Sequence, residues 1–219
     1  MMRIFSLQQL LLCGIRLKAA AAAATGGYRH PIIRSQLGFT LAELMTVISI
    51  IALAATIASP IYFSWLPRYR LRHAALELFA NYQRARMLAI RNGSEVAVVF
   101  KPEAGIYQIV SGGTNGRYDG FLYPSDDVVT QTVRLSDYGS DVAFGHGDAL
   151  KNATSTADAK FPADGISYND NIAKFNGEGL SNIKGHVYLT NCRRSAFAVA
   201  TPTMAGTVRL LMWNGLEWE

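Results

Sequence analysis

An acidic side chain stands inside an otherwise apolar stretch of the chain. Glu43 is the only charged residue between Phe39 and Ser59. At about 1.5 Å rise per residue, a helix over this stretch is about long enough to cross the hydrocarbon core of a bilayer. A carboxylate at that depth costs roughly 2–3.5 kcal/mol on membrane-insertion scales, so we expect Glu43 to have a partner. The alternative is a Glu43 carboxyl that is protonated in the membrane.

The chemistry that could supply this partner lies at the border between Gly38 and Phe39, where a basic segment meets the apolar stretch. Cleavage at this border would create a new α-amine with a pKa of about 8, which is mostly cationic at neutral pH. The amine would lie one helical turn before Glu43. It could therefore neutralise Glu43 in its own chain or in a neighbouring chain.

The segment from Gly38 to Pro60 resembles the N-terminus of type IV pilins and pseudopilins. It reads GFTLAELMTVISIIALAATIASP, and the family pattern is Gly, Phe, Thr and Leu with Glu at the fifth mature position and often a proline at the end. The resemblance implies cleavage after Gly38 by prepilin peptidase, N-methylation of Phe39, and assembly with other pilins or pseudopilins through Glu43. The alternative is a plain signal anchor in which Glu43 occurs by chance.

The segment before the cleavage site is basic. It carries five basic residues and no acidic one: Arg3, Arg16, Lys18, Arg29 and Arg34. Because positive charge stays on the cytoplasmic side, we expect a single-pass inner-membrane protein with its N-terminus in the cytoplasm and its C-terminal domain in the periplasm. The formal net charge of +5 comes entirely from this leader. The mature chain is formally neutral, so its net charge does not indicate a nucleic-acid partner. An alternative start of translation lies near Arg29 and leaves the cleavage site unchanged.

The pattern after Pro60 predicts that the helix continues, with a kink or local loosening there and near Pro67. Apolar residues then recur at steps of three and four up to the stop signal Asn92-Gly93, which is typical of an amphipathic helix. We therefore predict an α+β fold in which one long N-terminal helix, half transmembrane and half amphipathic, packs on a C-terminal antiparallel β-sheet domain. The expected segments are a leader (1–38), a transmembrane helix (39–66), an amphipathic helix (67–93) and a periplasmic β-rich domain (94–219).

Strand patterns fill the chain after Glu95. The runs 96–100 and 106–110 flank a turn and predict a hairpin. Further strands are expected at 128–135, 141–144 and 172–175, and a terminal antiparallel meander at 186–190, 196–200 and 207–213. Residues 145–165 are polar and small and indicate a long surface loop.

The helix end and the β-region together resemble the GspH/FimT group of minor pseudopilins and minor pilins. The matching segments are Ala85–Gly93, the turn Phe175–Gly179, and the Gly-Thr-Val-Arg run from Gly206 to Arg209. This resemblance implies a minor pseudopilin of a type II secretion system. The alternative is a FimT-type minor pilin of a type IV pilus, involved in pilus assembly or in DNA uptake through basic surface residues. The candidates for DNA contact are Arg193, Arg194 and Arg209, whose binding to phosphate would be sensitive to salt; a charged turn between strands is the simpler interpretation.

Few residues indicate catalysis or a cofactor. His146 and His186 lie in the β-region, but no Gly-x-Ser-x-Gly elbow accompanies them. The loop acids lack the regular spacing of a calcium loop, and the two cysteines, Cys13 and Cys192, have no zinc or haem spacing. After leader removal Cys192 is alone, and we expect it to be a small buried apolar residue. We predict a protein that is not an enzyme and has neither a cofactor nor a metal.

Overall fold

The computed structural model describes residues 38–120, 126–153 and 161–219, so most of the predicted leader lies outside the described residues. The chain divides into two compact units, Met1–Val47 and Ile48–Glu219. All the packing of strands and helix described below belongs to the second unit. The four segments predicted from the sequence remain predictions as domains.

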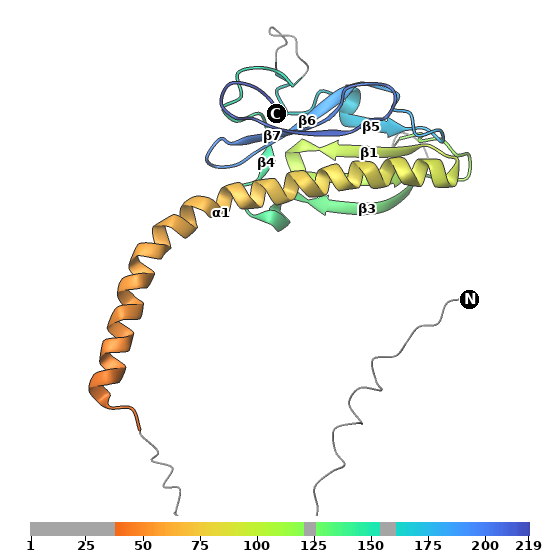
Figure 1. Cartoon of the computed structure of the whole chain (residues 1–219). Helices are drawn as coiled ribbons and strands as arrows, with labels where there is room; N and C mark the ends of the chain where they lie inside the picture. Colours follow the sequence, from red (N-terminus) through yellow and green to blue (C-terminus); the bar gives the residue numbers. More distant parts are fainter. Residues whose placement is uncertain (1–37, 121–125, 154–160) are drawn as a thin grey trace, which may run out of the picture. The chain divides into compact units, whose positions relative to one another are not determined.

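The first element is a single long helix, α1 (Leu41–Asn92; Figure 1). It begins directly after Thr40 and runs without interruption through Pro60 and Pro67; the loosening expected at the prolines remains a prediction. The helix ends at the predicted stop. Gly93 follows with a φ of 62°, a left-handed conformation that glycine adopts without Cβ strain.

Only the second half of α1 is packed against other elements. Every residue from Leu41 to Trp65 is exposed. From Leu71 onward, one face is buried at steps of three and four residues, comprising Leu71, Ala74, Ala75, Leu78, Asn81, Tyr82, Ala85 and Ala89. This confirms the predicted amphipathic half, and the many alanines let neighbouring elements approach the helix axis closely.

The first sheet has the strand order β3-β2-β1-β5, and all neighbours are antiparallel. Its strands are β1 (Val96–Lys101), β2 (Ile106–Ser111), β3 (Val128–Arg134) and β5 (Ile172–Phe175). The predicted hairpin is confirmed: β1 and β2 are joined by a short 3-10 helix, η1 (Pro102–Ala104), and by Gly105. The other 3-10 helices are η2 (Leu135–Tyr138) and η3 (Asn169–Asn171).

The second sheet has the strand order β4-β6-β7-β8, again antiparallel throughout. Its strands are β4 (Ala143–Phe144), β6 (Gly185–Thr190), β7 (Ala196–Thr201) and β8 (Arg209–Met212). The terminal meander predicted from the sequence is therefore confirmed as β6-β7-β8. The division into two sheets was not predicted, because β5 precedes the meander in the sequence yet pairs with β1.

One hydrophobic core joins α1 to both sheets. The ring of Tyr82 on α1 lies 6.2 Å from that of Phe100, 6.1 Å from that of Phe175 and 6.4 Å from that of Tyr168. From the second sheet, buried residues of β6 and β7 join the same cluster, among them Val187, Leu189, Phe197 and Val199. The predicted α+β architecture, one long helix packed on antiparallel sheets, is confirmed.

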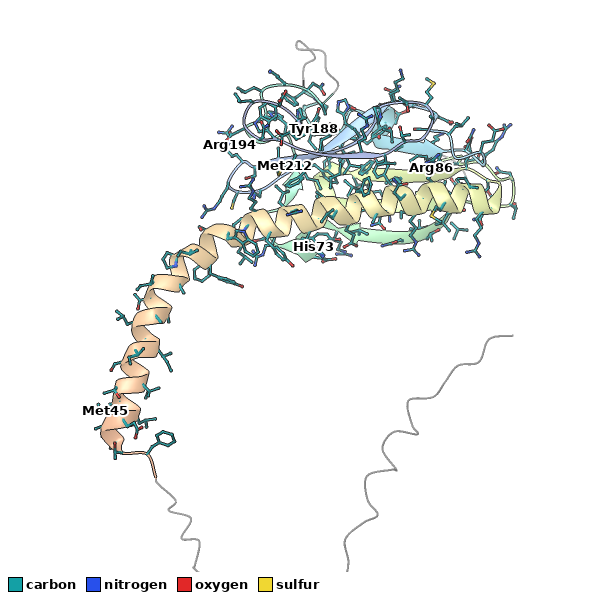
Figure 2. The ribbon with its side chains drawn as sticks, in the orientation of Figure 1. Met45, His73, Arg86, Tyr188, Arg194 and Met212 are labelled. Carbon is teal, nitrogen blue, oxygen red and sulfur yellow. The ribbon has the colours of Figure 1, made fainter. Side chains whose placement is uncertain are left out.

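The outer face of the second sheet is covered as well. Tyr188 on β6 points outward, and its hydroxyl accepts a hydrogen bond from the Ala153 backbone N–H over 2.9 Å. The rings of Phe161 and Trp218 each lie 5.4 Å from the Tyr188 ring (Figure 2). Both described ends of the predicted surface loop 145–165 therefore contribute to packing; residues 154–160 lie outside the described residues.

Candidate functional site

The predicted cleavage border lies directly before α1, outside any helix or strand. Gly38 and Phe39 are both exposed, and the Phe39 side chain is 82% accessible. Thr40 then caps the helix, because the Glu43 backbone N–H donates a hydrogen bond to Thr40 Oγ1 over 3.2 Å. A Thr at the cap with a Glu three residues later is the sequence signature of a capping box.

Sequence reasoning missed this cap, although the Thr-x-x-Glu spacing contains the signal. The cap gives Glu43 a second possible role, because a carboxylate in the first turn of a helix interacts favourably with the helix dipole. The first turn is closed by the Leu44 N–H donating to the Thr40 carbonyl over 3.1 Å. Phe39 precedes Leu41, the first residue of α1, so an α-amine at Phe39 would lie just before the turn that contains Glu43.

Three hydroxyl groups within the exposed half of α1 donate hydrogen bonds to the helix backbone. Thr46 Oγ1 donates to the Glu43 carbonyl over 2.8 Å, Thr56 Oγ1 to that of Ala52 over 2.6 Å, and Ser64 Oγ to that of Ile61 over 2.7 Å. A polar group left unbonded in hydrocarbon costs several kcal/mol. Glu43 is the only acidic or basic residue of this apolar stretch. The length and composition of α1 suffice to cross a membrane.

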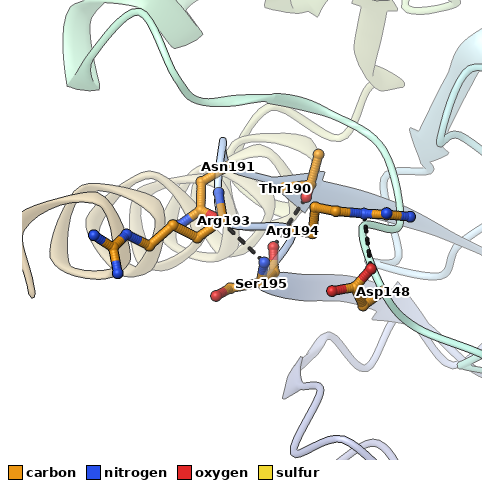
Figure 3. A network of polar contacts seen from close by, with 6 residues as sticks. All are labelled: Asp148, Thr190, Asn191, Arg193, Arg194 and Ser195. Atoms are coloured by element: carbon orange, nitrogen blue, oxygen red, sulfur yellow. Dashed lines mark hydrogen bonds and ion pairs between the residues drawn. The ribbon is translucent and has the colours of Figure 1, made fainter. Parts of the chain in front are cut away.

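The basic residues predicted for DNA contact occupy two places rather than one. Arg193 and Arg194 lie in the turn between β6 and β7 (Figure 3), which Asn191 organises by accepting the Arg193 and Ser195 backbone N–H groups, each over 3.1 Å. Arg209 pairs with Ala200, at the other end of β7. Ala196 and Ala200 are four residue steps apart on β7, so the separation is about 13 Å along the strand. Arg209 is therefore not adjacent to the arginine pair.

Arg194 already has an acidic partner. Its Nε lies 2.7 Å from Asp148 Oδ1, and the Asp148 N–H donates to the Arg194 carbonyl over 2.9 Å. Both side chains are more than half exposed, so the ion pair itself contributes at most about 1 kcal/mol. The neighbouring Cys192 is exposed, which corrects the expectation of a buried thiol; it sits in this polar turn rather than on a strand.

The histidines of the β-region are not arranged as catalytic bases. The His186 side chain is buried, and neither ring nitrogen has a hydrogen-bond partner within the described residues. Burial lowers the pKa of His186 to about 4. The ring of His146 stacks on that of Phe161 at 4.0 Å. A catalytic imidazole is usually oriented by a hydrogen bond from a third group, and neither ring has such an arrangement in the described part of the chain.

The acidic residues of the loops accept hydrogen bonds from neighbouring loop residues. Asp126 accepts hydrogen bonds from the Thr114 N–H over 2.5 Å and from the Thr114 hydroxyl, and these bonds lower the pKa of its carboxyl group. Asp127 accepts from the Gly120 N–H over 3.0 Å. Among the described residues, no group of three or more His, Cys, Asp or Glu side chains is placed to hold a metal ion.

The three segments in which the sequence resembles the GspH/FimT group meet at one junction. Arg86, from the Ala85–Gly93 segment of α1, donates from Nε to the Gly179 carbonyl over 2.9 Å and from a terminal nitrogen to the Ala205 carbonyl over 3.3 Å (Figure 2). Gly179 ends the second segment and Gly206 begins the third. A Cβ at Gly206 would come within 2.1 Å of the Gly179 carbonyl oxygen, so this close approach requires glycine.

Comparisons with known proteins locate the clearest similarity at the start of α1. The prokaryotic N-terminal methylation motif matches residues 33–59. No match was found among curated proteins. Among solved structures, the minor pseudopilin EpsH of the type II secretion system of Vibrio cholerae is 12% identical and covers 65% of this chain and 97% of its own, with a TM-score of 0.42.

A second solved structure, the type IV minor pilin FimU of Pseudomonas aeruginosa, is 13% identical and covers 69% of this chain and 94% of its own, with a TM-score of 0.42. At these values the structural likenesses carry no argument about function. The motif at residues 33–59 and the long helix packed on antiparallel sheets together identify a pilin-like chain.

Proposed function

We propose that the chain is a minor pseudopilin of a type II secretion system, inserted in the inner membrane and assembled with other pilin-like subunits through α1 to support protein export. The observation that carries this proposal is the methylation motif at residues 33–59. The matched segment contains Gly38 and Phe39, which precede α1, and Glu43, which lies in the first turn of its exposed apolar half.

In this proposal, prepilin peptidase cleaves after Gly38 and the new N-terminus at Phe39 is methylated. Gly38 and Phe39 are exposed and lie outside any helix or strand, which supports access for a peptidase. The Glu43 carboxylate then pairs with the cationic α-amine of Phe39 in a neighbouring subunit. Such a pair offsets the cost of an ionised carboxylate in the apolar layer, which is roughly 2–3.5 kcal/mol on insertion scales.

Intact mass and N-terminal sequencing of the protein from its own membranes test this route. We expect a chain that begins with N-methylated Phe39. An uncut chain, or an N-terminus between Ala19 and Gly27, would remove the main support for assembly into a filament.

The alternative is a FimT-type minor pilin that contacts DNA through Arg193, Arg194 and Arg209. The separation of Arg209 from the other two arginines and the Arg194–Asp148 pair weigh against one continuous DNA surface. Neighbouring genes distinguish the two systems: a secretin with further pseudopilins supports secretion, whereas pilus assembly and competence genes support the pilus. A salt series of DNA binding with the wild type and an Arg193→Ala/Arg194→Ala variant tests the DNA contact itself.

A further inference from the structure

The residues that follow the apolar stretch of α1 match the composition of a membrane surface. A hydrocarbon core of about 30 Å accommodates about 20 helical residues, so a span that starts near Leu41 ends near Ile61. The next turns expose four aromatic side chains, namely Tyr62, Phe63, Trp65 and Tyr69, and the rings of Trp65 and Tyr69 stack at 5.2 Å. Exposed Trp and Tyr residues are enriched where helices leave the hydrocarbon.

Arg68 lies within this aromatic segment. Its guanidinium reaches the folded unit, where a terminal nitrogen lies 4.0 Å from Met212 Sδ. By helical rise, Arg68 lies about 10 Å beyond Ile61, which is next to the headgroup layer of the membrane.

A hollow of about 240 Å³ opens beside Arg68. Its other walls are the turn between β6 and β7, with Arg193 and Arg194, and the end of β8, with Met212 and Trp213. Asp148 also lines the hollow. Residues far apart in the sequence thus meet Arg68 where α1 enters the folded unit.

The charge of this hollow is positive. Asp148 is its only acidic residue and is bound by Arg194 at 2.7 Å. Arg68 and Arg193 have no acidic partner among the described residues. Arg68 donates from a terminal nitrogen to Met212 Sδ over 4.0 Å. Figure 3 shows the Arg193 side chain directed away from Arg194 and Asp148. Two guanidinium groups are therefore available to an anion.

We propose that this hollow binds the phosphate of an anionic phospholipid headgroup through Arg68 and Arg193, and thereby holds the β6–β7 turn on the membrane surface. Guanidinium groups bind phosphate through paired N–H donors, and Trp213 and Met212 supply apolar surface beside them. A lipid is favoured over other phosphates because Arg68 lies next to the headgroup layer, within about 10 Å of the end of the span. This inference rests on the proposed function, since it requires that α1 spans the membrane.

The test uses the full chain in nanodiscs that contain phosphatidylglycerol and phosphatidylcholine. Native mass spectrometry measures the ratio of the two lipids that stay bound after the disc is released. An arginine at an anionic surface contributes about fivefold in affinity, so Arg68→Gln and Arg193→Gln should each lower the phosphatidylglycerol preference by about fivefold, and high salt should weaken it in the wild type.

Arg209→Gln is the matched control, because it removes the same charge at the far end of β7. It should leave the preference unchanged. An equal loss in all three variants would mean that only net charge matters and would overturn the site. The three arginines are exposed and are not part of the hydrophobic core. Near-UV circular dichroism checks that each variant is folded.

Other ligands give other results. Inorganic phosphate that abolishes the preference would assign the hollow to a free anion. A short DNA duplex that binds through Arg193 and is not displaced by phosphatidylglycerol would assign the turn to nucleic acid. Either result overturns the lipid site. The same spectra report the N-terminus: methylated Phe39 without lipid preference refutes the lipid site alone, whereas unprocessed chains refute the proposed function.

Discussion

At the scale of single residues, Glu43 combines two kinds of interaction. Its backbone N–H is bonded to the capping hydroxyl of Thr40, and its carboxylate is the only charge in the apolar stretch up to Ser59. A cap contributes about 1 kcal/mol to a helix. An unpaired carboxylate in hydrocarbon costs more than that, so the local cap alone does not account for an acidic residue at this position.

Variants of Glu43 and Thr40 separate these two interactions. Glu43→Gln keeps an amide that can serve in a capping box but removes the charge, and Glu43→Ala removes both. We expect both variants to insert in the membrane and to be lost from the filament fraction, measured by shearing and immunoblotting. Thr40→Val, which removes the cap only, should still assemble. Filament incorporation of Glu43→Gln at the wild-type level would contradict the charge-pairing account.

His186, on β6 of the second sheet, makes the stability of the folded chain depend on pH. Its pKa is lowered by burial from the ordinary value near 6.5 to about 4, and its ring nitrogens have no partner in the described residues. The unfolded chain therefore binds this proton more readily than the folded chain. The neutral ring contributes its full stability above pH 6.5, and this contribution is lost as the pH falls from about 6.5 to about 4.

We expect acidification across that interval to reduce the free energy of unfolding by up to about 3 kcal/mol through His186. Urea unfolding of the full chain in detergent, followed by tryptophan fluorescence at several pH values, measures the loss. His186→Phe, which cannot titrate, should flatten the pH dependence in this range, whereas replacing the exposed His73 by Phe should not. An unchanged slope in His186→Phe would show that other groups carry the effect.

At the scale of elements, Arg86 connects α1 to two loops that are far away in the sequence. It is half-buried and donates to the carbonyls of Gly179 and Ala205. These carbonyls belong to segments that no strand ladder connects to α1. The junction therefore fixes the loop after β5 and the loop before β8 against the helix.

Arg86→Ala leaves two carbonyls without their charged donor, so we expect a loss of about 1–3 kcal/mol in stability. Thermal unfolding in detergent measures this loss. Arg84→Ala is the matched control on the same helix, because its bond to Gln131 over 2.8 Å is exposed and should contribute less than about 1 kcal/mol. Equal effects of the two variants would argue that the junction has no special role.

At the scale of the whole molecule, the second half of α1 is the element against which both sheets are built. Leu78 on α1 belongs to the same core as Phe175 of the first sheet and Val199 of the second. A core shared in this way makes the folded unit cooperative. Displacement of the helix would expose the buried inner faces of both sheets to solvent.

We expect Leu78→Ala to lower the free energy of unfolding by about 2–5 kcal/mol. The melting temperatures of the two sheets should fall together. The near-UV signal of Trp213 and Trp218 reports on the second sheet, and hydrogen exchange of β1 and β2 reports on the first. Leu76→Ala, at a position that is 44% exposed, is the control and should have little effect. Separate melting of the two sheets in Leu78→Ala would contradict a single core.

The sequence by itself determined the features that depend on local pattern. The apolar run with Glu43, the helix end at Asn92-Gly93, the first hairpin and the terminal meander all rest on periodicity and turn residues close together in the chain. The methylation motif is likewise one continuous segment. For these features, neighbouring residues hold the whole signal.

Only the tertiary structure decided which distant segments meet. Periodicity does not encode strand partners, so the pairing of β5 with β1 and the distance of Arg209 from Arg193 came from the register. The Arg86 junction and the hollow beside Arg68 likewise join residues that are more than ninety positions apart. Their contacts form because burying one common core leaves each loop a single place to close against α1.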